Sequence, residues 1–352
     1  MTVGSANTKS PYELISRYRS ELMGFCILFV LYYHSALNSS SQFLQWLKMI
    51  CYGAVDIFML VSGMGIYRSL ESNSVSVFFR NRLKKIVPIW YLYYVIVLLA
   101  GHFFFNDEFR IHEISGFLTF TGYWLGLDDQ GNWYVYAIML FYLCSPVLAA
   151  MIRDSRNRLR TGLLMVLLSI FLSFAFFDTL QLMAFTRLPS YILGMVFAAC
   201  FRDRPFDRKG MAVSLGVFLV GAVMLSVIVA HFTYFLWYYG LLWYPFIFIA
   251  PPVTLFFCLF LDKLEALLRP LTALLRILGR ASLEILVISD FIFIRCGEYV
   301  YRWAEGHVSP SAVSVALFFA GALGGIAFHA VVERVKTLVS SCHSRLKAGA
   351  GA

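Results

Sequence analysis

The sequence predicts an all-α membrane protein, a polytopic bundle of about ten transmembrane helices with both termini in the cytoplasm. Of the 352 residues, 60% are hydrophobic and only 14% are charged, whereas a soluble domain has about 25% charged residues. The mean hydropathy is +0.74. A water-soluble core of this length would leave too much apolar surface uncovered, so lipid must surround several segments. The uneven distribution of cations between these segments predicts the orientation.

Apolar runs separated by polar, arginine-bearing or turn-like stretches predict the spans, since about 20 apolar residues cross the hydrocarbon core of a bilayer. The first run is short and follows two arginines, but Tyr-Tyr-His at 32–34 is too polar for a signal peptide. The predicted spans are 22–37, 50–67, 86–105, 132–152, 161–177, 187–201, 211–231, 237–261, 281–297 and 311–332. They form one domain, 22–335, between cytoplasmic tails at 1–21 and 336–352.

Cations lie mostly on one side of these spans. If the N-terminus is inside, all but five of the 29 Lys and Arg residues fall in inside segments. The exceptions are Lys48, Arg110, Arg187, Arg295 and Arg302. By the positive-inside rule, the N- and C-termini are both cytoplasmic. The net charge of +9 therefore reports orientation in a membrane rather than a nucleic-acid partner.

Ionisable groups inside a bilayer are costly, so those within spans are functional candidates. His34 lies eleven residues beyond Met23 in the outward-running first span, about 16 Å at 1.5 Å per residue. Asp56 lies one to two turns below the outer surface in the inward-running second span, at a similar depth, so the two side chains can meet. The other candidates are Arg187, Glu284, Asp290, Glu298 and His329.

A basic segment, FRNRLKKIVP at 79–88, separates the second and third spans and is predicted to be a cytoplasmic loop. It contains Arg80, Arg82 and Lys85. Such clusters bind anionic lipid head groups or phosphates. The alternative is that these charges serve only to orient the protein.

Several motifs occur in order along the chain. GAVDIFMLVSGMGIY occupies 53–67, and the first span begins with Leu-Met-Gly at 22–24 and ends with Tyr-His-Ser at 33–35. Arg82 and Lys85 are followed by Pro88. Later come Asn-Trp-Tyr at 132–134, Arg-Leu-Pro at 187–189 and LGRASLEI at 278–285. Together these segments resemble the acyltransferase 3 family, membrane O-acyltransferases that modify sugars of polysaccharides and lipopolysaccharide.

The resemblance implies an enzyme of the plasma (inner) membrane that moves an acyl group from acyl coenzyme A to a hydroxyl of a cell-surface or lipid-linked carbohydrate. Acetyl coenzyme A is the favoured donor, and no metal is expected. The catalytic residues would be His34 and Asp56, and the donor-binding residues Arg80, Arg82 and Lys85. The acyl and acceptor site would contain Trp133, Tyr134, Arg187 and Asp290.

Acyl transfer to a hydroxyl needs a base, because the hydroxyl is barely ionised near neutral pH. An imidazole has an unperturbed pKa near ~6.5, which suits this task, so His34 is expected to be the general base. Asp56 could orient the imidazole and stabilise its charged form. The alternatives are a packed histidine with one hydrogen bond and a carboxylate bonded to a neighbouring helix.

The other site candidates also have two interpretations. Arg187 either pairs with Asp178 or contacts an anion or a carbonyl group. Trp133 and Tyr134 either belong to the interfacial aromatic belt or form a stacking wall for a sugar. Glu284 and His329 are expected to bond to neighbouring side chains.

The chain departs from the family pattern at two positions. The family usually has Arg or Lys eleven residues before the histidine, where this chain has Met23. Arg19, one helical turn earlier, could substitute or could be a topology charge. In the ninth span many members have a His where this chain has Ser289, followed by Asp290. The chain therefore lacks the second histidine of this span, whereas His34 is present.

Two other functions remain open. A transporter or flippase of a glycan or small anion also has intramembrane charges, and predicts Gly- or Pro-broken helices at matching positions of two halves. Pro251 and Pro252 would break the eighth span, but the third span has no counterpart to them. A catalytically silent family member, acting as a receptor or assembly partner, is the second alternative.

Overall fold

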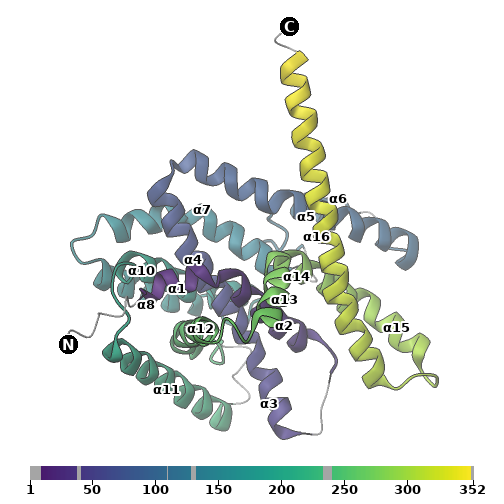
Figure 1. The fold of residues 1–352 in the computed structure, drawn as a ribbon. Helices are drawn as coiled ribbons and strands as arrows, with labels where there is room; N and C mark the ends of the chain where they lie inside the picture. Colours follow the sequence, from purple (N-terminus) through teal and green to yellow (C-terminus); the bar gives the residue numbers. More distant parts are fainter. Residues whose placement is uncertain (1–8, 38–40, 109, 128–131, 233–239, 350–352) are drawn as a thin grey trace.

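The computed structural model describes residues 9–37, 41–108, 110–127, 132–232 and 240–349. All the regular secondary structure of these residues is helical (Figure 1), which confirms the all-α prediction. The α-helices are α1 (Pro11–Arg17), α2 (Arg19–His34), α3 (Gln42–Ile50), α4 (Ala54–Ser72), α5 (Val75–Phe105), α6 (Ile111–Leu118), α7 (Trp133–Arg153), α8 (Arg158–Phe174), α9 (Leu182–Phe185), α10 (Leu188–Cys200), α11 (Arg208–His231), α12 (Phe246–Lys263), α13 (Arg269–Arg280), α14 (Ser282–Asp290), α15 (Gly297–Ala304) and α16 (Pro310–Gly349). A 3₁₀ turn, Cys51–Gly53, joins α3 to α4, and a π-helical turn, Phe291–Cys296, joins α14 to α15.

Seven helical segments among the described residues are long and apolar enough to cross a membrane, which makes this a multi-pass membrane protein. They are Gln42–Ser72, Val75–Phe105, Trp133–Arg153, Leu182–Cys200, Arg208–His231, Phe246–Lys263 and Pro310–Ser341. The other three predicted spans are helical but short or interrupted: α2 has 16 residues, α8 has 17, and the π turn divides the ninth span. The count of ten therefore stays a prediction. The first residues of the predicted span 237–261 lie outside the described residues.

Two local predictions were wrong. The basic segment 79–88 is not a loop, because α5 begins at Val75, where the Ser74 hydroxyl accepts a hydrogen bond from the Val77 amide, and continues through Pro88. Pro251 and Pro252 do not break the eighth span either, since α12 runs through both. Prolines are tolerated in membrane helices when neighbouring groups satisfy the freed carbonyls.

Glycines allow the central helices to approach closely. A Cβ atom on Gly63 of α4 would lie 2.0 Å from the Tyr191 carbonyl oxygen of α10, and one on Gly194 would lie 2.0 Å from that of Leu60. Small residues permit such contacts between membrane helices. This crossing holds α4, which carries Asp56, against α10, which Arg187 directly precedes.

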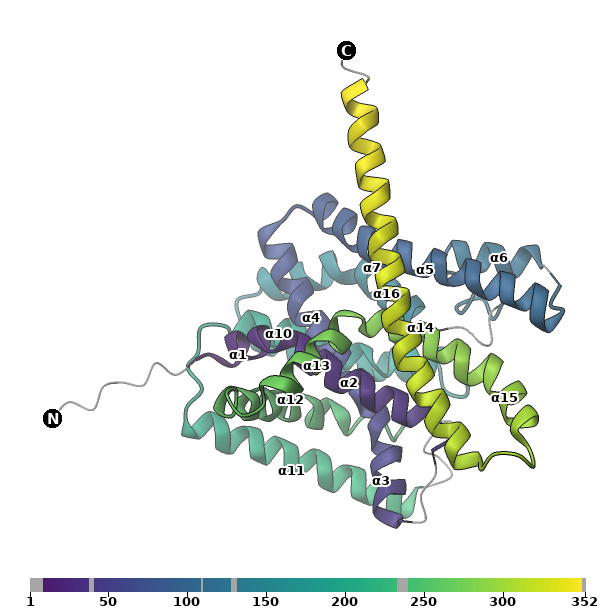
Figure 2. The same ribbon diagram turned by 45° about the vertical axis from the view of Figure 1, so that its right-hand side comes forward.

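The centre of the bundle is formed by α2 and α4, with α12 and α11 on one side (Figures 1 and 2). The C-terminal helix α16 crosses the bundle beside α14 and then projects beyond the other helices. At 40 residues it is about 60 Å long, roughly twice the thickness of a hydrocarbon core. Part of α16 must therefore lie outside the bilayer.

We expect reporter fusions to place both termini in the cytoplasm. The reason is the uneven division of cations between the two sides, together with a cavity that Arg19, Lys85 and Lys336 line in common. Alkaline phosphatase fused at the C-terminus should be inactive, and a cytoplasmic fluorescent reporter at that position should fold. Active phosphatase at the C-terminus would contradict the predicted orientation.

Candidate functional site

One face of α2 lines a cavity of about 550 Å³, here called the basic cavity. The lining residues of this helix are Arg19, Ser20, Met23, Ile27, Val30 and His34. Apart from Ser20, which is next to Arg19, they are spaced three or four residues apart and so lie on a single helical face. Arg19 and His34 lie about 22 Å apart along the helix axis. The basic cavity therefore extends from the first residue of α2 to its last.

The end of the basic cavity near Arg19 is rich in cations. Arg82 and Lys85 of α5 line it and interact electrostatically with Arg19. The Arg82 guanidinium lies over the ring of Tyr142, 5.7 Å from its centre, and its Nε has no hydrogen-bond partner among the described residues. A buried donor without a partner is costly, and the Arg82 side chain lines the cavity.

Two of the three predicted donor-binding residues line the basic cavity, and the third does not. Arg82 and Lys85 both face the basic cavity, because residues three apart share a helix face. Arg80 is exposed and lines none of the cavities described here. Arg280 and Lys336 also line the basic cavity, although the sequence identifies them only as topology charges, because nothing in it places α13, α16 and α5 around one cavity.

His34 lies where the basic cavity meets a second one. The central cavity, about 430 Å³, shares His34, Trp133 and Tyr134 with the basic cavity. The His34 side chain is exposed, and the surface that it exposes faces these two cavities. Trp133 and Tyr134 begin α7, so their indole and phenol rings are walls of the same junction. The structure thereby brings together three of the residues singled out in the sequence.

Asp56 forms a buried cluster with Arg187 and Ser190. The Ser190 hydroxyl donates a hydrogen bond to Asp56 Oδ1 at 2.7 Å, and Arg187 Nη1 lies 3.2 Å from Oδ2. Asp56 is 0% exposed and Arg187 3%. No hydrogen bond joins Asp56 to His34 among the described residues, so the expected orienting contact is replaced by the pairing with Arg187. The alternative pairing of Arg187 with Asp178 is absent from the described ion pairs as well.

Arg187 also faces the central cavity. Its guanidinium carbon lies 5.0 Å from the ring centre of Trp243 and 5.7 Å from that of Tyr52. Its Nε has no hydrogen-bond partner among the described residues. The cluster thus presents a positively charged donor, held by Asp56, to the space beside His34.

Asp290 and Ser289 point to different places. Asp290, the last residue of α14, lines the central cavity with His34 and Arg187. The neighbouring Ser289 is 3% exposed, lines none of these cavities, and donates a hydrogen bond to the Leu286 carbonyl of its own helix. Ser289 therefore contributes no side chain to the junction, and Asp290 remains beside it.

Arg19 lies one helical turn before the departure at Met23 and faces the same cavity. Both side chains line the basic cavity. A Cβ atom on Gly65 of α4 would lie 3.0 Å from Arg19 Nη1, so the glycine leaves room for the guanidinium. Arg19 supplies a cation to the basic cavity one turn before Met23.

Glu284 and His329 bond to each other, whereas the sequence predicted only that each would bond to a neighbouring side chain. His329 Nδ1 lies 2.8 Å from Glu284 Oε1, and both residues line the basic cavity. No group of three or more His, Cys, Asp or Glu residues among those described could hold a metal ion.

Comparisons with known proteins agree with the motifs. A family model described as an acyltransferase domain matches residues 22–330, most of the chain. No curated protein and no solved structure matches. The matched region contains α4, α7 and α10, together with the junction at His34 and the Arg187 cluster. The chain belongs to this acyltransferase family.

Proposed function

We propose that the protein is an O-acyltransferase of the plasma (inner) membrane that transfers an acyl group, in the favoured case acetyl, from acyl coenzyme A to a carbohydrate hydroxyl. The observation that carries this proposal is the meeting of two cavities at His34. One cavity is basic and suits the donor. The other is lined by aromatic side chains and Arg187 and suits the acceptor.

The donor assignment follows from charge. Coenzyme A carries a pyrophosphate and a 3′-phosphate, and Arg and Lys bind such groups. Arg19, Arg82 and Lys85 would hold the phosphates, while the pantetheine arm would extend along the face of α2 toward His34. A continuous cavity favours direct transfer, with the thioester brought to the base, over a relay through an acyl-enzyme.

The chemistry at the junction is a proton transfer coupled to acyl transfer. His34 would accept the proton of the acceptor hydroxyl while its oxygen attacks the thioester carbonyl carbon. The carbon–sulfur bond then breaks, the electron pair leaves with sulfur, and the imidazolium returns the proton to the thiolate. The products are an ester and free coenzyme A.

Arg187 would stabilise the negative charge that develops on the carbonyl oxygen. Its Nε is without a partner among the described residues and its guanidinium is nearly fully buried, and donors in such a water-poor site act strongly on developing charge. Asp56 is then a positioning residue, since it holds Arg187 through Oδ2.

The function is tested by release of thiol from acetyl coenzyme A by the purified protein in nanodiscs, with and without a carbohydrate extract of the cell surface. Mass spectrometry of surface glycans from cells with and without the gene identifies the modified sugar. If cells without the gene keep all the acyl groups on their glycans, and the purified protein releases no thiol, the protein would be a catalytically silent family member instead.

We expect replacement of Arg82 and Lys85 by alanine to raise the KM for acetyl coenzyme A about tenfold or more, since each charge-assisted hydrogen bond to phosphate contributes about 1.5–3 kcal/mol. The kcat should change little, and thermal unfolding should stay near that of wild type. Arg80→Ala is the matched control, because Arg80 belongs to the same helix and faces away from the cavity. Equal KM values in the double variant and the control would show that the charges of this segment serve only to orient the protein in the membrane.

A further inference from the structure

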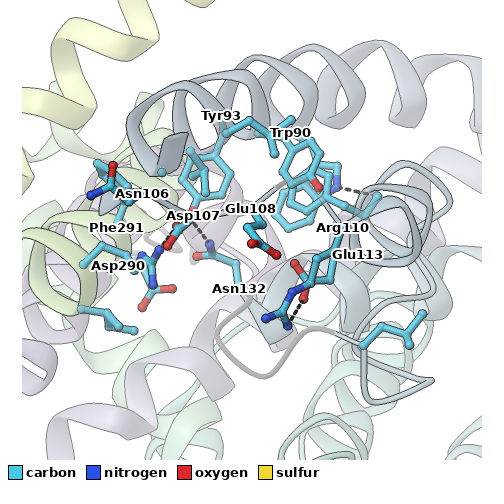
Figure 3. A pocket seen from close by; sticks show the side chains of 18 residues that line it. Trp90, Tyr93, Asn106, Asp107, Glu108, Arg110, Glu113, Asn132, Asp290 and Phe291 are labelled. Carbon is cyan, nitrogen blue, oxygen red and sulfur yellow. Dashed lines mark hydrogen bonds and ion pairs between the residues drawn. The ribbon is translucent and has the colours of Figure 1, made fainter. Parts of the chain in front are cut away.

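A third cavity, here called the acidic cavity, lies at the far end of α5 from the basic segment. It measures about 620 Å³ and is bounded by the last turns of α5, by α6 and by the π turn after α14 (Figure 3). Its lining from α5 begins at Trp90 and ends at Gly101, and Gly101 lies about 24 Å along the helix axis from Lys85. The acidic cavity therefore lies beside the C-terminal half of α5, and the basic segment lies in the N-terminal half.

One wall of the acidic cavity is aromatic. The rings of Tyr94 and Phe117 stack with centres 3.6 Å apart, and Phe117 stacks on Trp90 at 4.0 Å. Tyr93 lines the same wall, and its hydroxyl accepts a hydrogen bond from Asn132 Nδ2 at 3.1 Å (Figure 3). Flat apolar rings with hydroxyls at their edge suit the mixed apolar and polar faces of a sugar.

The opposite side of this cavity carries an excess of negative charge. Its lining contains four carboxylates and two guanidinium groups: Asp107, Glu108, Glu113, Asp290, Arg110 and Arg295. The guanidinium groups are engaged, since Arg110 pairs with Glu113 and Arg295 with Asp107. Glu108 has no ion pair or hydrogen bond among the described residues, and Figure 3 shows its carboxylate in the open space of the cavity.

The acidic cavity continues into the central one. Asn132, Asp290 and Ile294 line both. A molecule bound against the aromatic wall can therefore reach toward the junction at His34. There, the unpartnered Nε of the buried Arg187 is a further sign that a ligand occupies this space.

We propose that the acidic cavity binds the acceptor together with the central cavity, and that it selects a non-acidic carbohydrate, either neutral or bearing an amino group. This inference rests on the proposed function, because it assigns the acceptor of the same reaction. The carboxylate of Glu108, which has no ion pair among the described residues, repels uronic acids and phosphorylated sugars and attracts ammonium groups. It also repels coenzyme A, so the donor and acceptor ends of the protein differ in the sign of their charge.

The test measures binding of three probes that differ in charge: methyl glucosaminide, methyl glucoside and methyl glucuronide. Saturation-transfer NMR on the full-length protein in nanodiscs, without donor, gives each Kd. The glucosaminide should bind most tightly and the glucuronide most weakly. Glu108→Gln should reduce the ratio of the glucuronide Kd to the glucosaminide Kd about threefold, the effect of one partly screened charge at short range. Glu305→Gln removes an exposed carboxylate that does not line the cavity, and should leave the ratio unchanged.

An unchanged ratio in Glu108→Gln, equal affinities in wild type, or no binding of any probe would overturn the inference. Thiol release from acetyl coenzyme A, measured separately with the same glycosides, tests the proposed function. Glycosides that bind in the predicted order without any thiol release would leave the acidic cavity as a carbohydrate site and refute the transfer reaction.

Discussion

Alanine at position 34 is expected to lower the rate of acyl transfer by about 10²–10⁴-fold, the usual effect of losing a general base. The imidazole is the basic group that lines both the basic and the central cavity at their junction. Because its side chain faces the cavities, its loss should leave the fold intact. The measurement is thiol release from acetyl coenzyme A in the presence of acceptor, with donor affinity determined in parallel.

His231→Ala is the matched control for this variant. His231 ends α11, is exposed, and lines none of the cavities described here. It should retain wild-type activity, while His34→Ala should bind donor with near wild-type affinity. A His34→Ala protein that still transfers the acyl group at a wild-type rate would show that another residue is the general base. Asp290 of the central cavity is then the next candidate.

Asp56→Asn is expected to destabilise the protein by about 3–5 kcal/mol, because it leaves the charge of Arg187 unpaired in the interior. The double variant Asp56→Asn with Arg187→Gln removes both charges, and should be more stable than either single variant. Thermal unfolding in a single detergent would measure this coupling. All three variants should have a low kcat, since each disturbs or deletes the Arg187 contact proposed for the transition state.

The double variant separates a structural role from a functional one. If the ion pair were needed only for stability, recovery of stability should restore the kcat. If Arg187 stabilises developing charge, the stable double variant should remain inactive while its KM for acetyl coenzyme A stays near that of wild type. A fully active double variant would therefore contradict the role proposed for Arg187.

The sequence predicted the chemistry of single segments better than their mutual positions. Hydropathy identified the helices that carry His34 and Asp56, because segments surrounded by lipid are apolar in composition. It did not predict that Asp56 pairs with Arg187. That contact depends on the crossing at Gly63 and Gly194, and two glycines far apart in the sequence do not reveal that they face each other.

The start of α5 was predicted wrongly for a related reason. The basic segment at 79–88 was assigned to a loop because its charges interrupt the apolar run, although Arg and Lys favour helices. In the structure these charges extend α5 beyond the apolar run. Of the acidic cavity, the sequence indicated only Asp290 as a site residue, since the lining comes from α5, α6, the segment between them and the π turn, which lie far apart in the sequence.

The opposite charges at the two ends of the connected cavities bear on what can pass through the membrane. Under the proposed reaction, cations retain the phosphates of coenzyme A at one end, and carboxylates at the other end repel them. The uncharged acyl group then becomes the sole part of the donor that moves outward. Such a protein would export acyl groups while coenzyme A stays inside the cell. It would require no ion gradient, because cleavage of the thioester supplies the free energy.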